Sequence, residues 1–379
     1  MNNLAFVSSY CFPSENNPQL GRFVLDQCLA LKKKGVNIVV LNVARTTKLF
    51  TKKINIKSCC SIPVVETHIF SFALIRFPRL SIFRYKQKLK KIYQIAEKKY
   101  GKPSVIYSHF SFPVGMAMNF LSQKYSIPHV VMEHHSLYYR KKIPTIVKNN
   151  LCNLINYSNR FLCVSSSLKK NIIRHAKCDE NKINVIGNII DGCYDFVEHE
   201  KNTVFRFFAA GNLVPLKKMD VLIEAMYLLK KKGVLCILHI AGDGPERKKL
   251  DDLVKKLELS DEVLLLGRMD KLGILDEYKE CDCFVLPSIF ETFGIVYREA
   301  MFVGRPVISA ANGGINEGWR SECGYICDPL TSETLSKTMN DMIDNYDYFN
   351  LKGISDYAKN CFSADAVADK IIDCLVKKA

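Results

Sequence analysis

One stretch, residues 284–319, constrains the fold of this chain more than any other. It opens with a short apolar run at residues 284–286, which is typical of a buried parallel strand. A polar turn follows at residues 291–294, and apolar residues then recur at helical spacing from Ile295 until a glycine predicts the helix end. A second apolar run at residues 306–308 completes the order strand, loop, helix, strand. We therefore predict an α/β fold with a parallel sheet.

The loop after the first of these strands is where we expect a ligand. It lies at the carboxyl edge of the sheet, where the next helix presents free N–H groups and the positive end of its dipole. Those amides suit a phosphate, whereas Glu291 and Glu299 would repel one and suit sugar hydroxyls. The alternative is a structural role without a ligand, in which Glu291 complements the helix dipole and Glu299 is a solvated helix residue. The residues expected to supply the amides are Thr292, Phe293, Gly294 and Ile295.

The same stretch resembles a known enzyme family. The spacing Glu-x7-Glu, the preceding Leu-Pro-Ser and the following Glu-Ala-Met-x-x-Gly-x-Pro-Val-Ile are similar to the nucleotide-sugar segment of one family. This is family 4 of the retaining GT-B glycosyltransferases, the glycosyl transferases group 1. There the first glutamate contacts the donor sugar and the second holds the ribose hydroxyls. The resemblance implies these roles for Glu291, as a catalytic residue, and for Glu299.

The start of the chain also follows the order strand, glycine loop, helix, strand. An apolar run at residues 4–7 predicts the first strand, and a long polar loop ends at Gly21. The loop lacks Gly-x-Gly-x-x-Gly, so a nicotinamide dehydrogenase is not supported here. In family 4 a glycine loop at this place lies near the donor phosphates and the acceptor. Gly21 matches one of the two glycines that many relatives have.

Three histidines stand where predicted strands end. His109, with Pro113 and Gly115, resembles the family pattern His-x-x-x-Pro-x-Gly, which implies that His109 lies beside the donor sugar and takes part in catalysis. His134 and His135 follow the next apolar strand and resemble the family's second histidine region less specifically. For these two, contact with the acceptor and structural packing are equally open.

The second half of the chain begins with a loop that resembles the diphosphate-binding loop of the family. There an arginine and a lysine five positions apart grip the diphosphate; Lys217 matches the lysine, but Asn212 stands where arginine is common. Lys218 replaces a common glycine, so the two lysines can supply the charge as point cations. Further on, Gly267 and Arg268 resemble the base-binding edge and are expected to contact the base or a phosphate.

The resemblance covers nearly the whole chain and implies the GT-B architecture, in which two Rossmann-like domains face each other across a cleft. We expect residues 1–190 to form the acceptor domain and residues 200–360 to form the nucleotide-sugar domain. Residues 361–379 are expected to form a helix that returns to the first domain. The linker is expected at residues 192–202.

Composition favours a metal-free cytoplasmic enzyme. The 379 residues are 48% hydrophobic, yet we find no apolar run of the roughly 18 residues that a membrane span needs and no signal peptide. The 15 cysteines include no two pairs at zinc-ribbon spacing, which indicates a reducing compartment and no metal site. No Asp-x-Asp occurs, so we expect the diphosphate to be stabilised without a metal or any other cofactor.

A net charge of +16 predicts an anionic partner, and the excess is concentrated in residues 45–102. A solvated helix face is one interpretation. We favour a surface that rests on the anionic inner face of the cell membrane, because apolar side chains are interleaved with the charges. These side chains are Phe70, Phe72, Phe77, Leu80, Ile82, Phe83 and Tyr85.

The predicted reaction moves a hexosyl group from a nucleotide diphosphate sugar to an acceptor hydroxyl, with retention of the anomeric configuration. UDP is favoured by its frequency in the family, and GDP stays open. The acceptor is expected to be a glycan or glycolipid, such as a lipid-linked precursor of a surface polysaccharide or lipopolysaccharide. Two alternatives are a GT-B nucleotide-sugar 2-epimerase and a non-enzymatic nucleic-acid binder. The latter is suggested by charge alone, so no nucleic-acid partner is expected.

Overall fold

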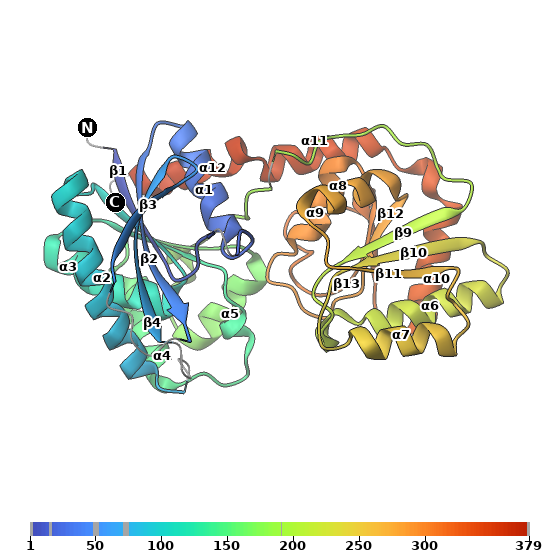
Figure 1. Cartoon of the computed structure of the whole chain (residues 1–379), viewed down its shortest axis with the longest axis horizontal. Coiled ribbons are helices and arrows are strands. Elements are labelled where there is room, and N and C mark those ends of the chain that lie inside the picture. Colours follow the sequence, from blue (N-terminus) through green and yellow to red (C-terminus); the bar gives the residue numbers. More distant parts are fainter. Residues whose placement is uncertain (1–2, 15–16, 48–52, 71–75, 191, 377–379) are drawn as a thin grey trace. The chain divides into compact units, whose positions relative to one another are not determined.

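The chain forms two compact units, which we describe separately. The computed structural model describes residues 3–14, 17–47, 53–70, 76–190 and 192–376. The first unit comprises Met1–Ile189 together with Ala364–Ala379, and the second comprises Ile190–Ser363. Each unit is a mainly parallel sheet flanked by helices (Figure 1).

The first unit is built on an eight-stranded sheet of order β3-β4-β2-β1-β5-β6-β7-β8. Neighbouring strands are parallel except for the hairpin pair β3 and β4. Both faces are covered, so the inner strands β1 and β5 are buried along their whole length. The strands are β1 (Leu4–Ser9), β2 (Asn37–Thr46), β3 (Asn55–Cys59), β4 (Ile62–Phe70), β5 (Val105–His109), β6 (His129–Glu133), β7 (Arg160–Cys163) and β8 (Ile183–Val185).

The last helix of the chain, α12, belongs to this first unit and packs against α1 (Figure 1). Lys34 pairs with Asp369 at 2.9 Å, but such exposed pairs contribute little. Burial of Val367, Ala368 and Ile371 is therefore the main force that holds α12. The helices of the unit are α1 (Arg22–Lys33), α2 (Pro78–Tyr100), α3 (Met116–Tyr125), α4 (Thr145–Tyr157), α5 (Ser166–Ala176) and α12 (Ala364–Val376).

The second unit has a six-stranded, wholly parallel sheet of order β11-β10-β9-β12-β13-β14. The strands are β9 (Phe205–Ala210), β10 (Cys236–Ala241), β11 (Val263–Gly267), β12 (Cys283–Leu286), β13 (Val307–Ala310) and β14 (Gly324–Cys327). The helices are α6 (Met219–Lys231), α7 (Arg247–Lys256), α8 (Lys271–Glu280), α9 (Ile295–Val303), α10 (Ser332–Asp344) and α11 (Leu351–Phe362). The strand, loop, helix and strand predicted within residues 284–319 are confirmed as β12, α9 and β13.

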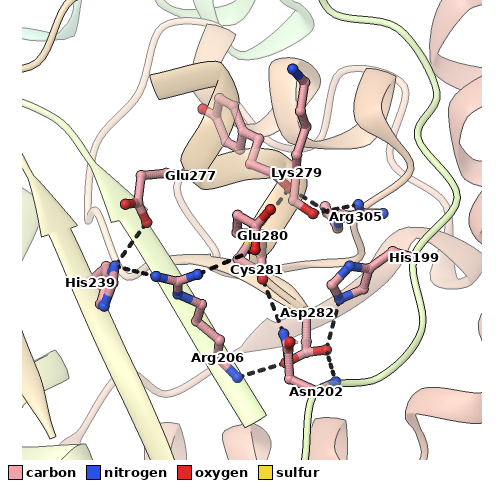
Figure 2. A network of polar contacts seen from close by, with 11 residues as sticks. His199, Asn202, Arg206, His239, Glu277, Lys279, Glu280, Cys281, Asp282 and Arg305 are labelled. Carbon is pink, nitrogen blue, oxygen red and sulfur yellow. Dashed lines mark hydrogen bonds and ion pairs between the residues drawn. The ribbon is translucent and has the colours of Figure 1, made fainter. Parts of the chain in front are cut away.

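A polar network closes the amino edge of this second sheet (Figure 2). Asp282, which immediately precedes β12, is fully buried. Its carboxylate accepts hydrogen bonds from His199 Nε2 at 2.9 Å, from Arg206 N at 2.6 Å, and from both N and Nδ2 of Asn202 at 2.9 Å. Burial raises the pKa of Asp282, but these bonds outweigh it and hold the pKa below its ordinary value.

A second buried charge, Arg305, extends the network (Figure 2). Its guanidinium donates to the carbonyl oxygens of Tyr278 at 3.0 Å, Lys279 at 2.8 Å and Val197 at 3.1 Å. These carbonyls lie in the segment that enters the unit and at the carboxyl end of α8. Arg305 therefore satisfies a helix end that would otherwise be left without partners.

Candidate functional sites at the carboxyl ends of the strands

The carboxyl edge of the second sheet brings together two residues assigned to separate ligand contacts. Lys217 ends a short 3-10 helix after β9, and Glu291 lies in the loop after β12. The strands β9 and β12 are neighbours, so these loops meet. Lys217 Nζ forms an ion pair with Glu291 Oε1, and the two side chains are 19% and 15% exposed. A cation and a carboxylate therefore stand side by side, both accessible to a ligand.

Glycines allow the surrounding loops to converge on this pair. A Cβ atom on Gly314, in the loop after β13, would lie 2.6 Å from Cβ of Glu291. A Cβ atom on Gly242, after β10, would lie 1.9 Å from the carbonyl oxygen of Gly211, after β9. Both distances are too short for any side chain, so these loops pack backbone against backbone.

The turn at residues 291–294 is held by a residue that the sequence analysis missed. Arg298 is buried, and its guanidinium donates to the carbonyl oxygens of Gly294 at 3.3 Å, Gly314 at 2.9 Å and Ile315 at 3.1 Å. It thereby ties the turn to the loop after β13. Burial lowers the pKa of Arg298 to about 10, so the side chain stays charged near neutral pH. An arginine followed directly by a glutamate in a mostly apolar helix was the available signal.

The other residues predicted in the turn and helix differ in what they expose. Gly294, with φ of 74°, precedes the first residue of α9. Thr292 is half-buried, whereas Phe293 is buried with its ring 5.4 Å from that of Phe362, so Phe293 can offer a ligand only its backbone. Glu299 is half-buried and accepts a hydrogen bond from Tyr278 Oη at 3.2 Å.

The remaining predicted donor contacts lie at the same edge of this sheet. Asn212 is exposed in the loop after β9, and Lys218, half-buried with φ of 54°, precedes α6. Gly267, with φ of 76°, ends β11, and Arg268 is exposed just after it. In the sheet, β11 is three strand positions from β12, which is roughly 14 Å at the usual strand spacing. A ligand that contacts both Glu291 and Arg268 must span that distance.

In the first unit, His109 and His134 form a stacked pair. His109 is the last residue of β5 and is fully buried. Its Nδ1 lies 3.0 Å from Nε2 of His134, and the two rings are 5.2 Å apart and nearly parallel. Burial lowers the pKa of His109, and burial also lowers the pKa of His134 to about 3. Both imidazoles are therefore neutral near pH 7.

Glu133 holds the loops that carry these histidines. This buried residue ends β6 and accepts hydrogen bonds from the backbone N–H groups of Ser111 at 2.8 Å, His134 at 2.8 Å and His135 at 2.7 Å. The hydroxyl of Ser111 donates to the same carboxylate. Burial raises the pKa of Glu133, and these hydrogen bonds oppose the increase. The sequence analysis did not single out Glu133 as a residue of this site.

Gly21 and His135 complete the predicted positions of the first unit. Gly21, with φ of 71°, precedes α1, and a Cβ atom there would lie 2.5 Å from the carbonyl oxygen of Cys11. In the first turn of α1, Phe23 packs its ring 4.5 Å from that of His134, so this loop lies beside the histidine pair. His135 Nδ1 accepts a hydrogen bond from Leu137 N at 2.8 Å. His134 and His135 therefore each use a ring nitrogen within the protein.

Two family matches cover most of the chain. Residues 20–192 match Glycosyltransferase Family 4, and residues 194–360 match Glycosyl transferases group 1. The protein belongs to this family of glycosyltransferases, which confirms the resemblance first seen in residues 284–319.

Two of its relatives illustrate the range of similarity. "Uncharacterized glycosyltransferase MJ1178" of Methanocaldococcus jannaschii is 30% identical over 248 residues, which are 63% of this chain and 66% of that protein. A phosphatidylinositol N-acetylglucosaminyltransferase subunit of Homo sapiens is 23% identical over 337 residues, 86% of this chain and 66% of that protein. The chain thus spans slightly less than two thirds of the length of either relative.

Solved structures confirm the fold class. Sucrose-phosphate synthase from Thermosynechococcus elongatus has a TM-score of 0.76 at 17% identity, covering 98% of this chain and 97% of that one. Anabaena HepE in complex with UDP has a TM-score of 0.72 at 18% identity, covering 98% of both chains. The two Rossmann-like α/β units are those of the GT-B class.

Two features of the described residues bear on metal binding and on membrane insertion. In the part of the chain that the structure describes, no three His, Cys, Asp or Glu side chains gather as a set of metal ligands. Among the same residues, none of the helices has the length and apolar character needed to cross a membrane. Independence of metal and other cofactors stays a prediction.

Proposed function

We propose that the protein transfers a hexosyl group from a UDP-sugar to an acceptor hydroxyl with retention of configuration. The Lys217–Glu291 pair carries this proposal, because a cation for a diphosphate and a carboxylate for sugar hydroxyls stand together at the carboxyl edge of a Rossmann-like sheet. The choice of UDP is supported by the complex of HepE with that nucleotide.

The ion pair suggests how donor binding prepares the site. A diphosphate brings more negative charge to Lys217 than one carboxylate does, so Lys217 exchanges partners when the donor binds. Glu291 is then free to accept hydrogen bonds from the sugar. Lys218 and the amides of residues 292–295 share the charge of the leaving diphosphate, and Glu299 holds the ribose. The leaving phosphate takes the proton of the acceptor hydroxyl.

We further propose that the acceptor is lipid-linked and that helix α2 rests on an anionic membrane. Phe77, Leu80 and Phe83 are 51%, 53% and 56% exposed, and Arg76 and Arg79 are exposed beside them. Exposed apolar rings among cations suit the boundary of an anionic bilayer. The lipid substrate named for the human relative supports the same class of acceptor.

The interpretation of this segment needs one correction. Tyr85, which the sequence analysis grouped with the surface aromatics, is fully buried. It lies on the face of α2 that also buries Leu89 and Ile92, because these positions recur at helical spacing. Phe72 lies outside the described residues.

A donor screen tests the reaction. The purified protein should be stabilised by UDP-sugars more than by GDP- or ADP-sugars in a thermal-shift assay. It should then transfer the sugar to a lipid-linked acceptor, with an anomeric configuration that NMR of the product shows to be retained. A C2 epimer formed from the donor alone would instead establish the epimerase reaction. Turnover of no nucleotide sugar, with or without acceptor, would contradict the proposal.

Vesicle co-sedimentation tests the membrane surface. The protein should bind vesicles containing phosphatidylglycerol, and binding should weaken as salt is raised. Replacing Leu80 and Phe83 by serine should reduce binding, whereas Lys98→Ser at the far end of α2 is the matched control. Equal binding by both variants would contradict a membrane role for this face.

A further inference from the structure

A cavity lies in the second unit beside its outermost strand, β14. Its volume is about 350 Å³, which falls within the range of small-molecule sites. One wall comes from the start of β14 and the residues just before it, and the other comes from the segment that joins α10 to α11. None of the lining residues belongs to the network around Asp282 or to the loops that carry Lys217 and Glu291. The lining residues include Glu322, Tyr325, Asn345, Tyr348, Phe349 and Asn350.

The aromatic residues of the cavity leave one ring open to a ligand. Tyr348 is 87% exposed, the highest value among the large apolar side chains of the described residues. Its neighbour Phe349 is half-buried and packs edge to face with Tyr325, with the ring centres 5.6 Å apart. Those two rings pack on each other, whereas the ring of Tyr348 is free to stack. A flat apolar ring with a hydroxyl at its rim matches the C–H face and the hydroxyl edge of a pyranose sugar.

The polar groups of the cavity suit hydroxyl groups of a ligand. Oδ1 of Asn350 accepts a hydrogen bond from Gly353 N at 2.9 Å, which leaves the NH₂ group of the amide to donate. Glu322 is exposed and accepts from Ser321 Oγ at 3.2 Å, and its carboxylate has further lone pairs. Donors and acceptors therefore line one cavity, and a sugar hydroxyl can bind to both because it donates and accepts.

The charge of the lining favours a neutral ligand. Among the described residues that line the cavity there is no lysine or arginine, and Glu322 carries a negative charge. A phosphate group would be repelled, which disfavours a nucleotide or a phospholipid headgroup. A quaternary ammonium group is usually held by a cage of several ring faces, whereas this cavity offers one. A neutral molecule with several hydroxyl groups fits best.

The segment that carries Tyr348 is fixed before any ligand binds. Tyr346, which is 4% exposed, anchors the short 3-10 turn that ends at Tyr348. The backbone N–H of Tyr348 donates to Asn345 O at 3.1 Å, and that of Phe349 donates to Tyr346 O at 3.0 Å. Nδ2 of Asn345 donates to Asp341 O at 2.7 Å, which ties the turn to α10. Because the cavity is already ordered, binding costs little conformational entropy.

We propose that this cavity is a carbohydrate site, separate from the site of transfer, that binds a neutral pyranose residue of a glycan chain. The sugar ring stacks on Tyr348, and its hydroxyls bind to Asn350 and Glu322. The cavity thereby holds a glycan on the surface of the second unit. The inference goes beyond the proposed reaction and does not rest on it, because the lining residues alone define the ligand.

Saturation-transfer difference NMR of the full chain tests the site. The probes are maltotriose and the methyl glycosides of glucose, galactose, mannose and N-acetylglucosamine. At least one of them should bind, and its Kd should rise about tenfold in Tyr348→Ala. Tyr348→Phe keeps the stacking ring and should keep most of the affinity. The matched control is Asp347→Ala, at an exposed neighbour that does not line the cavity and should bind like the wild type.

A second variant on the opposite wall guards against misfolding of Tyr348→Ala. Glu322 is exposed, so Glu322→Ala should fold and should also weaken binding, by a smaller factor. Binding of none of the sugars, or equal binding by the wild type and both alanine variants, would overturn the proposal. Binding of tetramethylammonium that depends on Tyr348, without binding of any sugar, would mark a cation site and overturn it as well.

The outcomes also separate this inference from the proposed function. If a sugar binds at Tyr348 but no nucleotide sugar is turned over, the reaction is wrong and the carbohydrate site stands. If sugar transfer occurs and the alanine variants bind every sugar like the wild type, the reaction stands and the carbohydrate site is wrong.

Discussion

The two edges of the second unit's sheet carry similar charged side chains in opposite conditions. At the amino edge, Asp282 is fully buried and accepts four hydrogen bonds from protein groups. At the carboxyl edge, Glu291 is 15% exposed, and among the described residues its ion-pair partner is Lys217. A carboxylate whose oxygens already accept hydrogen bonds from several protein groups stabilises the fold. A carboxylate that can still accept hydrogen bonds can bind a ligand. We therefore interpret the amino edge as structural and propose the carboxyl edge as the functional one.

The same contrast holds for two buried arginines. Arg305 binds carbonyl groups at the amino edge, and Arg298 binds carbonyl groups of the loops around Glu291. Both satisfy backbone oxygens with a planar fork of donors. They differ in the part of the chain that each one holds. Loss of Arg298 frees the loops around Glu291, whereas loss of Arg305 frees the carboxyl end of α8.

The largest effect is expected at Glu291. Replacing Glu291 by glutamine keeps the size of the side chain and removes the charge, so sugar transfer should fall about a thousandfold. The unfolding temperature should change little, because the ion pair is partly exposed. The matched control is Glu280→Gln at the amino edge, which should retain full activity. Activity close to wild type in Glu291→Gln would contradict a functional role for the carboxyl edge.

Asp282→Ala should give the largest loss of stability. The change leaves the donors of His199, Asn202 and Arg206 buried without an acceptor, so the free energy of unfolding should fall by about 3 kcal/mol. Urea unfolding followed by the fluorescence of Trp319, the single tryptophan, reports on this unit. Asp276→Ala, at a 69% exposed side chain paired with Lys279, should cost less than about 0.5 kcal/mol. Equal losses for the two variants would contradict a structural amino edge.

Arg298→Lys and Arg305→Lys form a matched pair with a smaller effect. A lysine cannot reach several carbonyl oxygens with a fork, so each variant should lose about 2 kcal/mol of stability. Arg298→Lys should also lower kcat/KM about tenfold, because the turn at residues 291–294 loses its tie to the next loop. Arg305→Lys should leave kcat/KM near wild type. An unchanged kcat/KM in Arg298→Lys would mean that the turn is held by other contacts.

The smallest effect is expected in the pH dependence of stability. The pKa of Asp282 is lower in the folded protein than its ordinary value of 3.8. Its contribution is therefore fully present above the unfolded value and is lost as the pH falls through the folded pKa. The stability of the wild type should thus fall more steeply below about pH 4 than that of Asp282→Asn. Parallel curves for the two proteins would show that Asp282 does not titrate in this range.

The sequence predicted the fold well because apolar runs, and glycines that mark turns and helix ends, are local signals. It also placed Lys217 and Glu291 in loops at the ligand-binding edge. It did not predict their ion pair, because 74 residues separate them and contact depends on which strands are neighbours. Glu291 was assigned to the sugar and Lys217 to the diphosphate, and that division of roles stays a prediction.

The structural charges were the ones that sequence reasoning missed. Arg298, Arg305 and Asp282 lie in or beside apolar segments, where a single charge is usually interpreted as solvated. The two arginines bind backbone carbonyl groups, and Asp282 accepts from two backbone N–H groups as well as from His199 and Asn202. Most of these partners are backbone groups, which no pattern of residue types reveals. Tyr85 is the opposite case, a buried residue that was interpreted as exposed. It lies in a basic, aromatic segment, which concealed its helical spacing with Leu89 and Ile92.

The backbone contacts at Gly242 and Gly314 limit how this enzyme can be re-engineered. A substitution at either position places a carbon atom inside another loop, so a library that varies them should yield mostly misfolded protein. Asn212 and Arg268 are exposed at the same sheet edge and can change without moving the chain. Laboratory evolution toward a new donor should therefore accumulate its changes at these two side chains and leave both glycines untouched.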